Sequence, residues 1–199
     1  MQRESFMSAA AASLFPVFLK LAGRPVVIVG GGSVATSKLG SLLDAGAQVT
    51  VVAPQVTPEI AGSTATIRRG PFEASDLDNA WLVVAAGPPA VNREVAAEAE
   101  SRRVFVNAVD DPPNASLYLG GVVRRGGVTV AISTDGQAPA LAALIRQALD
   151  GLLPEDEIPR WLAIARDQRI EWAATGVPMD QRRPLLLRAL AGLYEDRQG

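Results

Sequence analysis

Residues 26–38 of the chain read VVIVGGGSVATSK, and this stretch decides the fold class. Four apolar residues with the character of a buried strand stop at three consecutive glycines, and residues with helical spacing follow them. Glycine is favoured where the backbone turns tightly or where another group must come close to it. We therefore expect a strand, a glycine turn and a helix here, with something bound close to the turn.

The regions around this stretch repeat its alternation of strand and helix. Short apolar runs predict parallel strands at residues 24–29, 47–54, 63–70, 80–86 and 104–110. Helical spacing predicts a helix at residues 33–45, which ends at Gly46, and another at residues 90–103. Strands and helices that alternate through right-handed crossovers build an α/β fold, here a Rossmann-type doubly wound parallel sheet.

The pattern changes after residue 113. Residues 115–134 predict two strands joined by a glycine-containing turn, and residues 138–154 predict a helix. The rest of the chain is helical, with Pro178 dividing two segments. We therefore expect three domains. Residues 1–113 form a dinucleotide-type sheet domain, residues 114–153 a small α+β segment of hairpin and helix, and residues 154–199 a C-terminal helical tail.

The composition limits the chemistry that the chain can perform. Of its 199 residues 48% are hydrophobic, and it has no Cys and no His. The commonest general base and the commonest nitrogen ligand for metals are therefore absent, and we assign no metal ligands. A net charge of −2 does not predict nucleic-acid binding, and no apolar run approaches the roughly 20 residues of a membrane span. The first 14 residues lack the apolar core of a signal peptide, so we expect a cytoplasmic protein.

The glycines fit a dinucleotide fingerprint. Gly30, Gly32 and Ala35 match G-x-G-x-x-G/A between a strand and a helix. In that fingerprint the first glycine makes the turn, the second lets a pyrophosphate reach the backbone, and the small third residue packs the helix on the strand. The end of the helix then offers free N–H groups to the phosphates. We predict a bound dinucleotide, and the alternative is a turn of purely structural purpose.

One part of the fingerprint is missing. An Asp or Glu about 20 residues further on normally holds the ribose hydroxyls. Here the second strand ends at Ala53-Pro54-Gln55, with no Arg beside it for a 2′-phosphate. Gln55 can hydrogen-bond a ribose, but the residues leave open the choice between NAD and NADP.

Two carboxylates follow the fifth expected strand. Asp110 and Asp111 stand at its carboxyl end, where open α/β sheets bind their ligands. We interpret them as candidates for acid–base work beside the nicotinamide. The alternative is a polar turn, since Asp before Pro is an ordinary turn former.

Several of these motifs, in this order, resemble one family. The stretches are FPVFLKLAGRPVVIVGGGSVATSK at residues 15–38, QVTVVAP at 48–54, AESRRVFVNAVDDP at 99–112 and VTVAISTDGQAPALAALIRQALDGLLP at 128–154. From about Leu14 to Pro154 the chain resembles the precorrin-2 dehydrogenase and sirohydrochlorin ferrochelatase family, the module that siroheme synthases carry at their N-terminus. The helical tail matches in length and character more than in residues.

The resemblance implies NAD-dependent oxidation of precorrin-2, a tetrapyrrole, to sirohydrochlorin in siroheme biosynthesis. It implies that Asp110 is the acid–base residue. Implied cofactor contacts are Gly30, Gly31, Gly32, Ser33, Val34, Pro54, Gln55, Ala86 and Asn107. Implied substrate contacts are Ser116, Arg124 and Thr134. It further implies a homodimer that the hairpin-and-helix segment joins.

Two other functions remain open. The first is a bifunctional enzyme that also inserts iron into sirohydrochlorin, for which Asp110 would accept pyrrole protons and carboxylates would admit Fe²⁺. The second is a dinucleotide-sensing module without enzymatic activity, which would need the glycine turn but no carboxylate at the nicotinamide end. Turnover of precorrin-2 distinguishes the sensor from either enzyme.

The remaining charges allow two interpretations. Paired arginines at 68–69, 102–103 and 124–125 are either solvated surface charge or cations for the carboxylates of the substrate. Where the family commonly has Ser-Thr-Gly-Gly, this chain has Asp135 at the third position. That side chain adds a negative charge near a site for a polycarboxylate.

Overall fold

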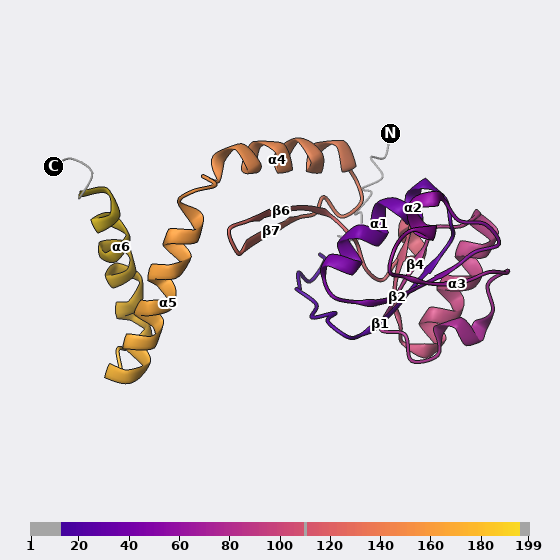
Figure 1. The fold of residues 1–199 in the computed structure, drawn as a ribbon, viewed down its shortest axis with the longest axis horizontal. Coiled ribbons are helices and arrows are strands. Elements are labelled where there is room, and N and C mark those ends of the chain that lie inside the picture. The colour runs from indigo at the N-terminus through magenta and orange to yellow at the C-terminus, as the bar shows by residue number, and fades with distance from the viewer. Residues whose placement is uncertain (1–12, 110, 196–199) are drawn as a thin grey trace, which may run out of the picture. The chain divides into compact units, whose positions relative to one another are not determined.

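Five parallel strands form a sheet in the computed structural model, which describes residues 13–109 and 111–195 (Figure 1). The strands are β1 (Pro25–Val29), β2 (Gln48–Val52), β3 (Thr66–Arg68), β4 (Leu82–Ala85) and β5 (Phe105–Ala108). They lie in the order β3-β2-β1-β4-β5. The order reverses next to β1, so the switch point, where such sheets bind ligands, lies between β1 and β4.

The central strand β1 is deeply buried in the sheet. Val26 and Ile28 are both 0% exposed, as expected for a parallel strand that is covered on both faces. The register aligns the ends of three strands, because Val29 pairs with Val52 of β2 and with Ala85 of β4. The loops that leave β1, β2 and β4 therefore start at one edge of the sheet.

The helices α1 (Ser33–Asp44) and α3 (Pro89–Arg102) pack on opposite faces of the sheet. Alternate residues of β1 point to opposite faces, so Val26 and Ile28 join the layer of α1 while Val27 and Val29 join that of α3. The helices contribute Ala35, Leu39 and Leu42 from α1 and Val95, Ala96 and Ala99 from α3. Each set has the spacing of one helical face, which is what the apolar pattern predicted.

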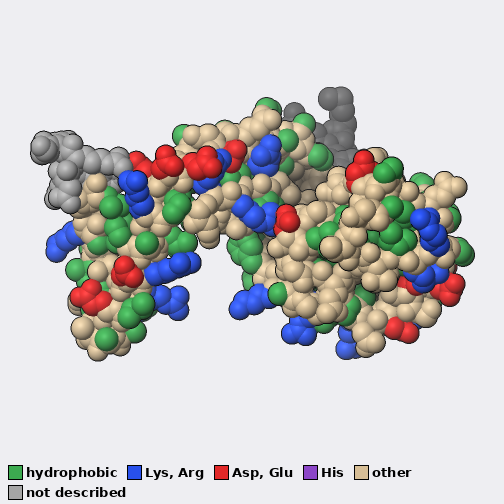
Figure 2. Space-filling view, viewed as in Figure 1, with side chains coloured by type: hydrophobic (Ala, Val, Ile, Leu, Met, Phe, Trp, Pro, Cys, Tyr) green, Lys and Arg blue, Asp and Glu red, His purple; other side chains and the backbone are tan. Residues whose placement is uncertain are grey.

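Residues 120–199 form a second compact unit. It contains an antiparallel hairpin of β6 (Gly121–Arg125) and β7 (Val128–Ile132), followed by α4 (Pro139–Leu152), α5 (Ile158–Thr175) and α6 (Met179–Glu195). Gly126 and Gly127 make the hairpin turn with φ of 54° and 89°, values that favour glycine. Hydrophobic side chains stand at the surface of α4 and of the α5–α6 pair (Figure 2).

An ion-pair cluster fixes α4 to the hairpin. Arg125 donates from β6 to the Asp150 carboxylate at 2.5 Å and to Glu155 at 3.0 Å. The hydrogen bond to Asp150 raises the pKa of Arg125 above its ordinary value. Arg125 thus has a structural partner at each side of its guanidinium, whereas its neighbour Arg124 is exposed.

The first unit extends beyond residue 113, where we predicted a domain boundary. The chain divides between residues 119 and 120. Ser116 and Leu117 both donate their backbone N–H to the carbonyl of Val106, at 3.0 and 2.9 Å. These bonds continue the pairing of β5, and they explain why this segment stays with the sheet. The division of residues 114–199 into a dimerisation segment and a tail stays a prediction.

The α/β fold class and the alternation of elements are confirmed. Three short elements were not predicted, namely α2 (Pro58–Ala61) and the single 3₁₀ turns η1 (Ala74–Leu77) and η2 (Pro112–Asn114). Each is four residues or fewer, too short to show a helical period. In the described ranges, every helix is too short or too polar to cross a membrane.

Candidate dinucleotide-binding cleft

A cleft of about 500 Å³ lies at the carboxyl ends of the strands in the first unit. It spans the switch point, because its walls come from the loops after β1, β2, β3 and β4. The lining residues are Val29, Gly30, Gly31, Gly32, Val52, Ala53, Pro54, Gln55, Gly70, Pro71, Phe72, Ala86, Gly87, Pro88, Val91 and Glu94. Open α/β sheets bind dinucleotides at this position.

Two of the three glycines are required by the fold itself. Gly30 has a φ of 128°, and a Cβ at this position would lie 2.3 Å from the carbonyl oxygen of Ala86. A Cβ on Gly31 would lie 1.9 Å from the carbonyl oxygen of Gln55. Real Cβ atoms do not approach this closely, so both positions need glycine to let the loops after β2 and β4 come together.

The third glycine has no such reason within the protein. Gly32 is the N-cap of α1 with a φ of −89°, which any residue adopts. Apart from its two chain neighbours, no described residue has an atom within 4 Å of the place that its Cβ would occupy. Gly32 therefore leaves an empty space beside the backbone on the wall of the cleft, of the kind that a pyrophosphate fills in the dinucleotide fingerprint.

The N-terminus of α1 faces this space with unsatisfied donors. In the described structure no side chain caps the helix, and its first turn holds no acidic residue. The first N–H groups of a helix have no partner within it, and the helix dipole places partial positive charge there. An anion bound at Gly32 would accept hydrogen bonds from these N–H groups and would interact favourably with the helix dipole.

Hydrogen bonds from neighbouring loops hold the glycine turn in place. Gly30 donates its N–H to the carbonyl of Val52 at 2.9 Å, and Thr57 donates its N–H to the carbonyl of Gly31 at 3.0 Å. The hydroxyls of Thr36 and Thr57 share a hydrogen bond of 2.8 Å. The turn is therefore fixed to the end of β2 and to α2 before any ligand arrives.

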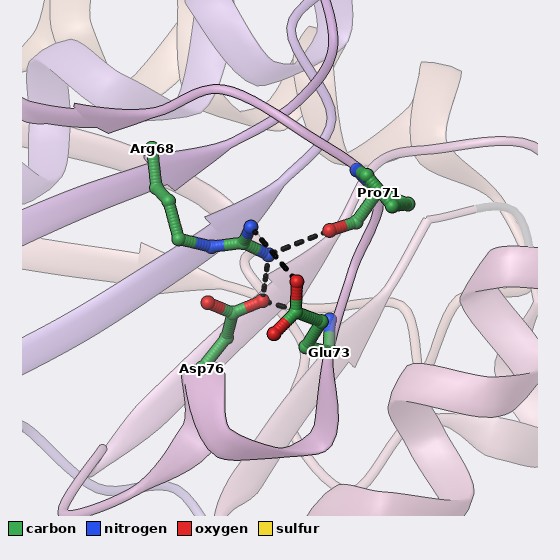
Figure 3. Close-up of polar contacts among 4 residues, drawn as sticks. All are labelled: Arg68, Pro71, Glu73 and Asp76. Carbon is green, nitrogen blue, oxygen red and sulfur yellow. Dashed lines mark hydrogen bonds and ion pairs between the residues drawn. The ribbon is translucent and has the colours of Figure 1, made fainter.

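A salt-bridge cluster shapes the wall after β3 (Figure 3). Arg68 donates to the carbonyl of Pro71 at 2.6 Å, is ion-paired with Asp76, and lies 3.5 Å from Glu73. The hydrogen bond that Arg68 donates to Asp76 raises the pKa of Arg68, so the guanidinium stays charged. Residues 70–72 line the cleft, so this cation has a structural role in holding that wall.

The wall after β4 is fixed by a buried amide. Gly87 donates its N–H to Oδ1 of Asn92 at 2.8 Å, and Asn92 is 5% exposed. This bond turns the chain from β4 into α3. The side chains of Val91 and Glu94, three residues apart on α3, then reach the cleft.

The structure brings together most of the residues that we assigned to the cofactor. Six of the nine line the cleft, namely Gly30, Gly31, Gly32, Pro54, Gln55 and Ala86. Ser33 and Val34 follow directly in the exposed first turn of α1. Asn107 does not line the cleft. It is buried in β5, and its side-chain amide donates to the carbonyl of Leu117 at 3.0 Å.

The three residues assigned to the substrate lie in two units. In the first unit, Ser116 accepts a hydrogen bond at its hydroxyl from the N–H of Val106 at 2.9 Å. In the second unit, Arg124 is exposed on β6, and Thr134 accepts a hydrogen bond from the N–H of Ala138 at the start of α4. Their role toward a substrate stays a prediction.

The proposed acid–base residue Asp110 lies outside the described residues. Its neighbour Asp111 is described and serves the turn that follows β5. Its carboxylate accepts a hydrogen bond from the side-chain amide of Asn114 at 2.8 Å. Asp111 therefore has the structural role that the turn interpretation gave to both carboxylates.

Sequence reasoning missed two parts of the cleft. Gly70 is the last residue of one predicted strand and Gly87 directly follows another. The carboxyl ends of parallel strands meet at one edge, so these positions could have indicated that both glycines line the cleft. Glu94 gave no such signal. It stands in the middle of a helix whose apolar residues reveal only which face is buried.

Two family descriptions match the chain. The family described as "Putative NAD(P)-binding" matches residues 17–121, and "Sirohaem biosynthesis protein central" matches residues 125–151. Two curated relatives are siroheme synthases. Siroheme synthase 3 of Aeromonas hydrophila is 41% identical over 190 residues, which are 92% of this chain and 40% of that protein. The siroheme synthase of Escherichia coli O1:K1 is 44% identical over 144 residues, which are 70% of this chain and 32% of that protein.

A solved structure is similar over nearly the whole chain. It is described as "SirC, precorrin-2 dehydrogenase" and has a TM-score of 0.68, with 29% identity over 88% of both chains. The curated relatives are longer, and the chain spans 40% or less of the length of those named above.

Proposed function

Because the chain belongs to the precorrin-2 dehydrogenase family of NAD(P)-binding proteins, we propose that it oxidises precorrin-2 to sirohydrochlorin with NAD⁺. The observation that carries the proposal is Gly32. At the switch point of the sheet, this glycine leaves a space that nothing in the described protein fills. The similarity to a precorrin-2 dehydrogenase then supplies the class of substrate.

The residues present fit a nicotinamide dinucleotide. The backbone of Gly30, Gly31 and Gly32 and the N-terminus of α1 would hold its pyrophosphate, since they offer N–H donors and a positive dipole end. The apolar side chains of Phe72 and Val91 would pack against the adenosine half. When bound, NAD⁺ accepts the hydride that leaves the substrate.

The protein contributes proton transfer and orientation. Asp110 follows β5 in the sequence, and we assign it the proton that the substrate must lose as the hydride leaves. A carboxylate suits this task in a chain without His, because it can both stabilise the developing positive charge and accept the proton. We give Asp111 no part in this step, because its carboxylate supports the turn by accepting a hydrogen bond from Asn114.

We assign NAD rather than NADP as the cofactor. None of the described residues that line the cleft is Lys or Arg. Arg68, which holds the wall after β3, is matched by Asp76 and Glu73. A 2′-phosphate carries extra negative charge and is normally bound by an Arg, so this cleft suits the cofactor that lacks it.

The working form that we propose is a homodimer joined through the second unit. Helix α4 carries exposed apolar residues at Leu141, Leu144, Ile145 and Leu152. Their spacing of three, four and eleven residues places them on one face of the helix. A continuous apolar stripe of this kind usually marks an interaction surface.

The experiment that tests the function is turnover of precorrin-2 by the purified chain. With NAD⁺ in excess, absorbance should report sirohydrochlorin and NADH in equal amounts. A chain that binds NAD⁺ but leaves precorrin-2 unchanged would be a dinucleotide sensor and not this enzyme.

A further inference from the structure

The cleft lacks the acid that dinucleotide-binding sheets carry at the end of β2. That position holds Ala53, Pro54 and Gln55, of which Ala53 is buried and the other two are exposed without charge. In the fingerprint, an Asp or Glu there accepts hydrogen bonds from the ribose hydroxyls and disfavours a 2′-phosphate. If the cleft is to prefer NAD over NADP, another residue must disfavour the 2′-phosphate.

A carboxylate does line the cleft, but it comes from the opposite wall. Among the described lining residues, Glu94 of α3 is the one with a charged side chain. The residue is exposed, and no hydrogen bond or ion pair engages it in the described part of the chain. Glu98, one helical turn further on, is instead paired with Arg102. Glu94 is thus an unpaired acid on a binding surface.

Glu94 lines the same cleft as the ends of β2 and β3, where the adenosine half of the cofactor would lie. The cleft that it lines is also bounded by residues 52–55 after β2 and residues 70–72 after β3. In this fold the ribose of the adenosine half lies at the end of β2, on the far side of the pyrophosphate from the nicotinamide. The glycine turn therefore lies between this region and the nicotinamide end.

We propose that Glu94 replaces the missing β2 acid and selects NAD over NADP. This inference rests on the proposed function, because it concerns the same cofactor. The carboxylate accepts hydrogen bonds from the ribose hydroxyls of NAD. It repels the phosphate that replaces the 2′-hydroxyl in NADP, and no lining Lys or Arg offsets that repulsion.

The test measures binding rather than turnover. Isothermal titration would give the Kd of NAD⁺ and of NADP⁺ for the full chain, for Glu94→Gln and for Glu98→Gln. We expect the wild type to prefer NAD⁺, and Glu94→Gln to lower that preference by about tenfold or more because it removes one like charge. Glu98→Gln changes the same residue type on the same helix away from the cleft, and it should leave the preference unchanged.

Two further measurements sharpen the test. The preference of the wild type should shrink between 0.05 and about 1 M salt, since ions screen the repulsion. Glu94→Lys should favour NADP⁺ over NAD⁺. An equal preference in wild type and Glu94→Gln, or a wild type that binds both dinucleotides alike, would overturn the assignment of Glu94. Failure to oxidise precorrin-2 would overturn the proposed function and leave these Kd ratios intact.

Discussion

Three adjacent glycines in this chain are glycine for two separate reasons. Gly30 and Gly31 let two loops of the protein pass within contact of the backbone. Gly32 faces an open space, so the fold tolerates a side chain there and only a ligand would meet it. This difference allows binding and folding to be separated by substitutions at neighbouring positions.

We expect Gly32→Val to lower the affinity for NAD⁺ by about tenfold or more while the protein stays folded, because the added side chain fills the space of the pyrophosphate. Titration with NAD⁺ and thermal unfolding of the same sample measure the two effects. Gly31→Ala is the contrasting variant. Its Cβ would meet the carbonyl of Gln55, so we expect a loss of about 1–3 kcal/mol in unfolding free energy. Unchanged NAD⁺ binding by Gly32→Val would contradict the placement of the pyrophosphate.

We expect Asp110→Asn to slow the oxidation of precorrin-2 by about 10²–10⁴-fold, because the amide cannot accept the proton that the substrate loses. Its Kd for NAD⁺ should barely change, since the glycine turn holds the phosphates. Stopped-flow absorbance gives the rate. Asp111→Asn is the control, since Asp111 supports a turn through Asn114 and should lose far less activity. Equal losses in the two variants would mean that the base is misassigned.

At the residue scale, the sequence predicted the glycine side of the cleft but not the opposite side. Gly30, Gly32 and Ala35 carry a spacing with a known mechanism. The structure places both glycines on the wall of the cleft and buries Ala35 between α1 and the sheet. Asn107 of β5 was assigned through the family resemblance, yet its side chain is used inside the protein. Contacts between distant segments decide which way a strand residue points and which polar group it meets. No local sequence pattern records those contacts.

At the scale of elements, one helix ends with a residue that departs from the usual preference for glycine at that position. Arg103 caps the C-terminus of helix α3 and adopts a left-handed φ of 58°. Its N–H bonds back to the carbonyl of Glu100, and the N–H of Val104 bonds to that of Ala99. This geometry normally selects glycine, because a Cβ in the left-handed region clashes with the backbone.

We therefore expect Arg103→Gly to raise the unfolding free energy by up to about 1 kcal/mol, since it removes that clash. Arg102→Gly is the matched variant one residue earlier. Arg102 lies inside the helix and pairs with Glu98 and Asp78, so glycine there should cost about 1 kcal/mol or more. Urea unfolding measures both. A decrease in stability for Arg103→Gly would show that the arginine makes a contact worth more than the strain.

The long elements were predictable because their buried apolar residues recur at regular spacing along the sequence. The spacing of Ala35, Leu39 and Leu42 in α1 reports the face that packs on the sheet. The continuous apolar run of β4 reports burial on both faces. Helix α6 was also predicted although it contains Pro184, since the flanking residues keep a helical pattern. Short elements such as α2 depend instead on one capping side chain, Thr57, which accepts from the N–H of Ile60.

At the scale of the whole molecule, the chain consists of two units of different kinds. The first has a buried sheet with two apolar layers. The second has few buried hydrophobic residues among those described, namely Val123, Ala142, Ile158 and Trp172. A unit with so small a core gains stability from association. The small buried core of the second unit therefore favours association with another protein chain.

We expect the chain to sediment as a dimer of about twice 20.8 kDa at micromolar concentration. Leu144→Asp places a charge on the apolar stripe of α4, where Leu144 is 63% exposed, and should shift the protein to monomers. Ile170→Asp changes a residue of α5 that is 70% exposed and off this stripe, and it should leave the dimer intact. A monomeric wild type would contradict the proposal, and so would a Leu144→Asp variant that stays dimeric.

The segment after β5 has a consequence for how the protein behaves at high concentration. β5 is an edge strand, and an exposed edge invites strand addition by another chain, a common start of aggregation. Here Ser116 and Leu117 occupy the carbonyl of Val106, and the hydroxyl of Ser116 occupies its N–H. The chain thus covers part of its own edge before it continues into the second unit. In the folded chain we expect this cover to lower strand-to-strand association through β5 at high concentration, while the cleft on the neighbouring strands stays open.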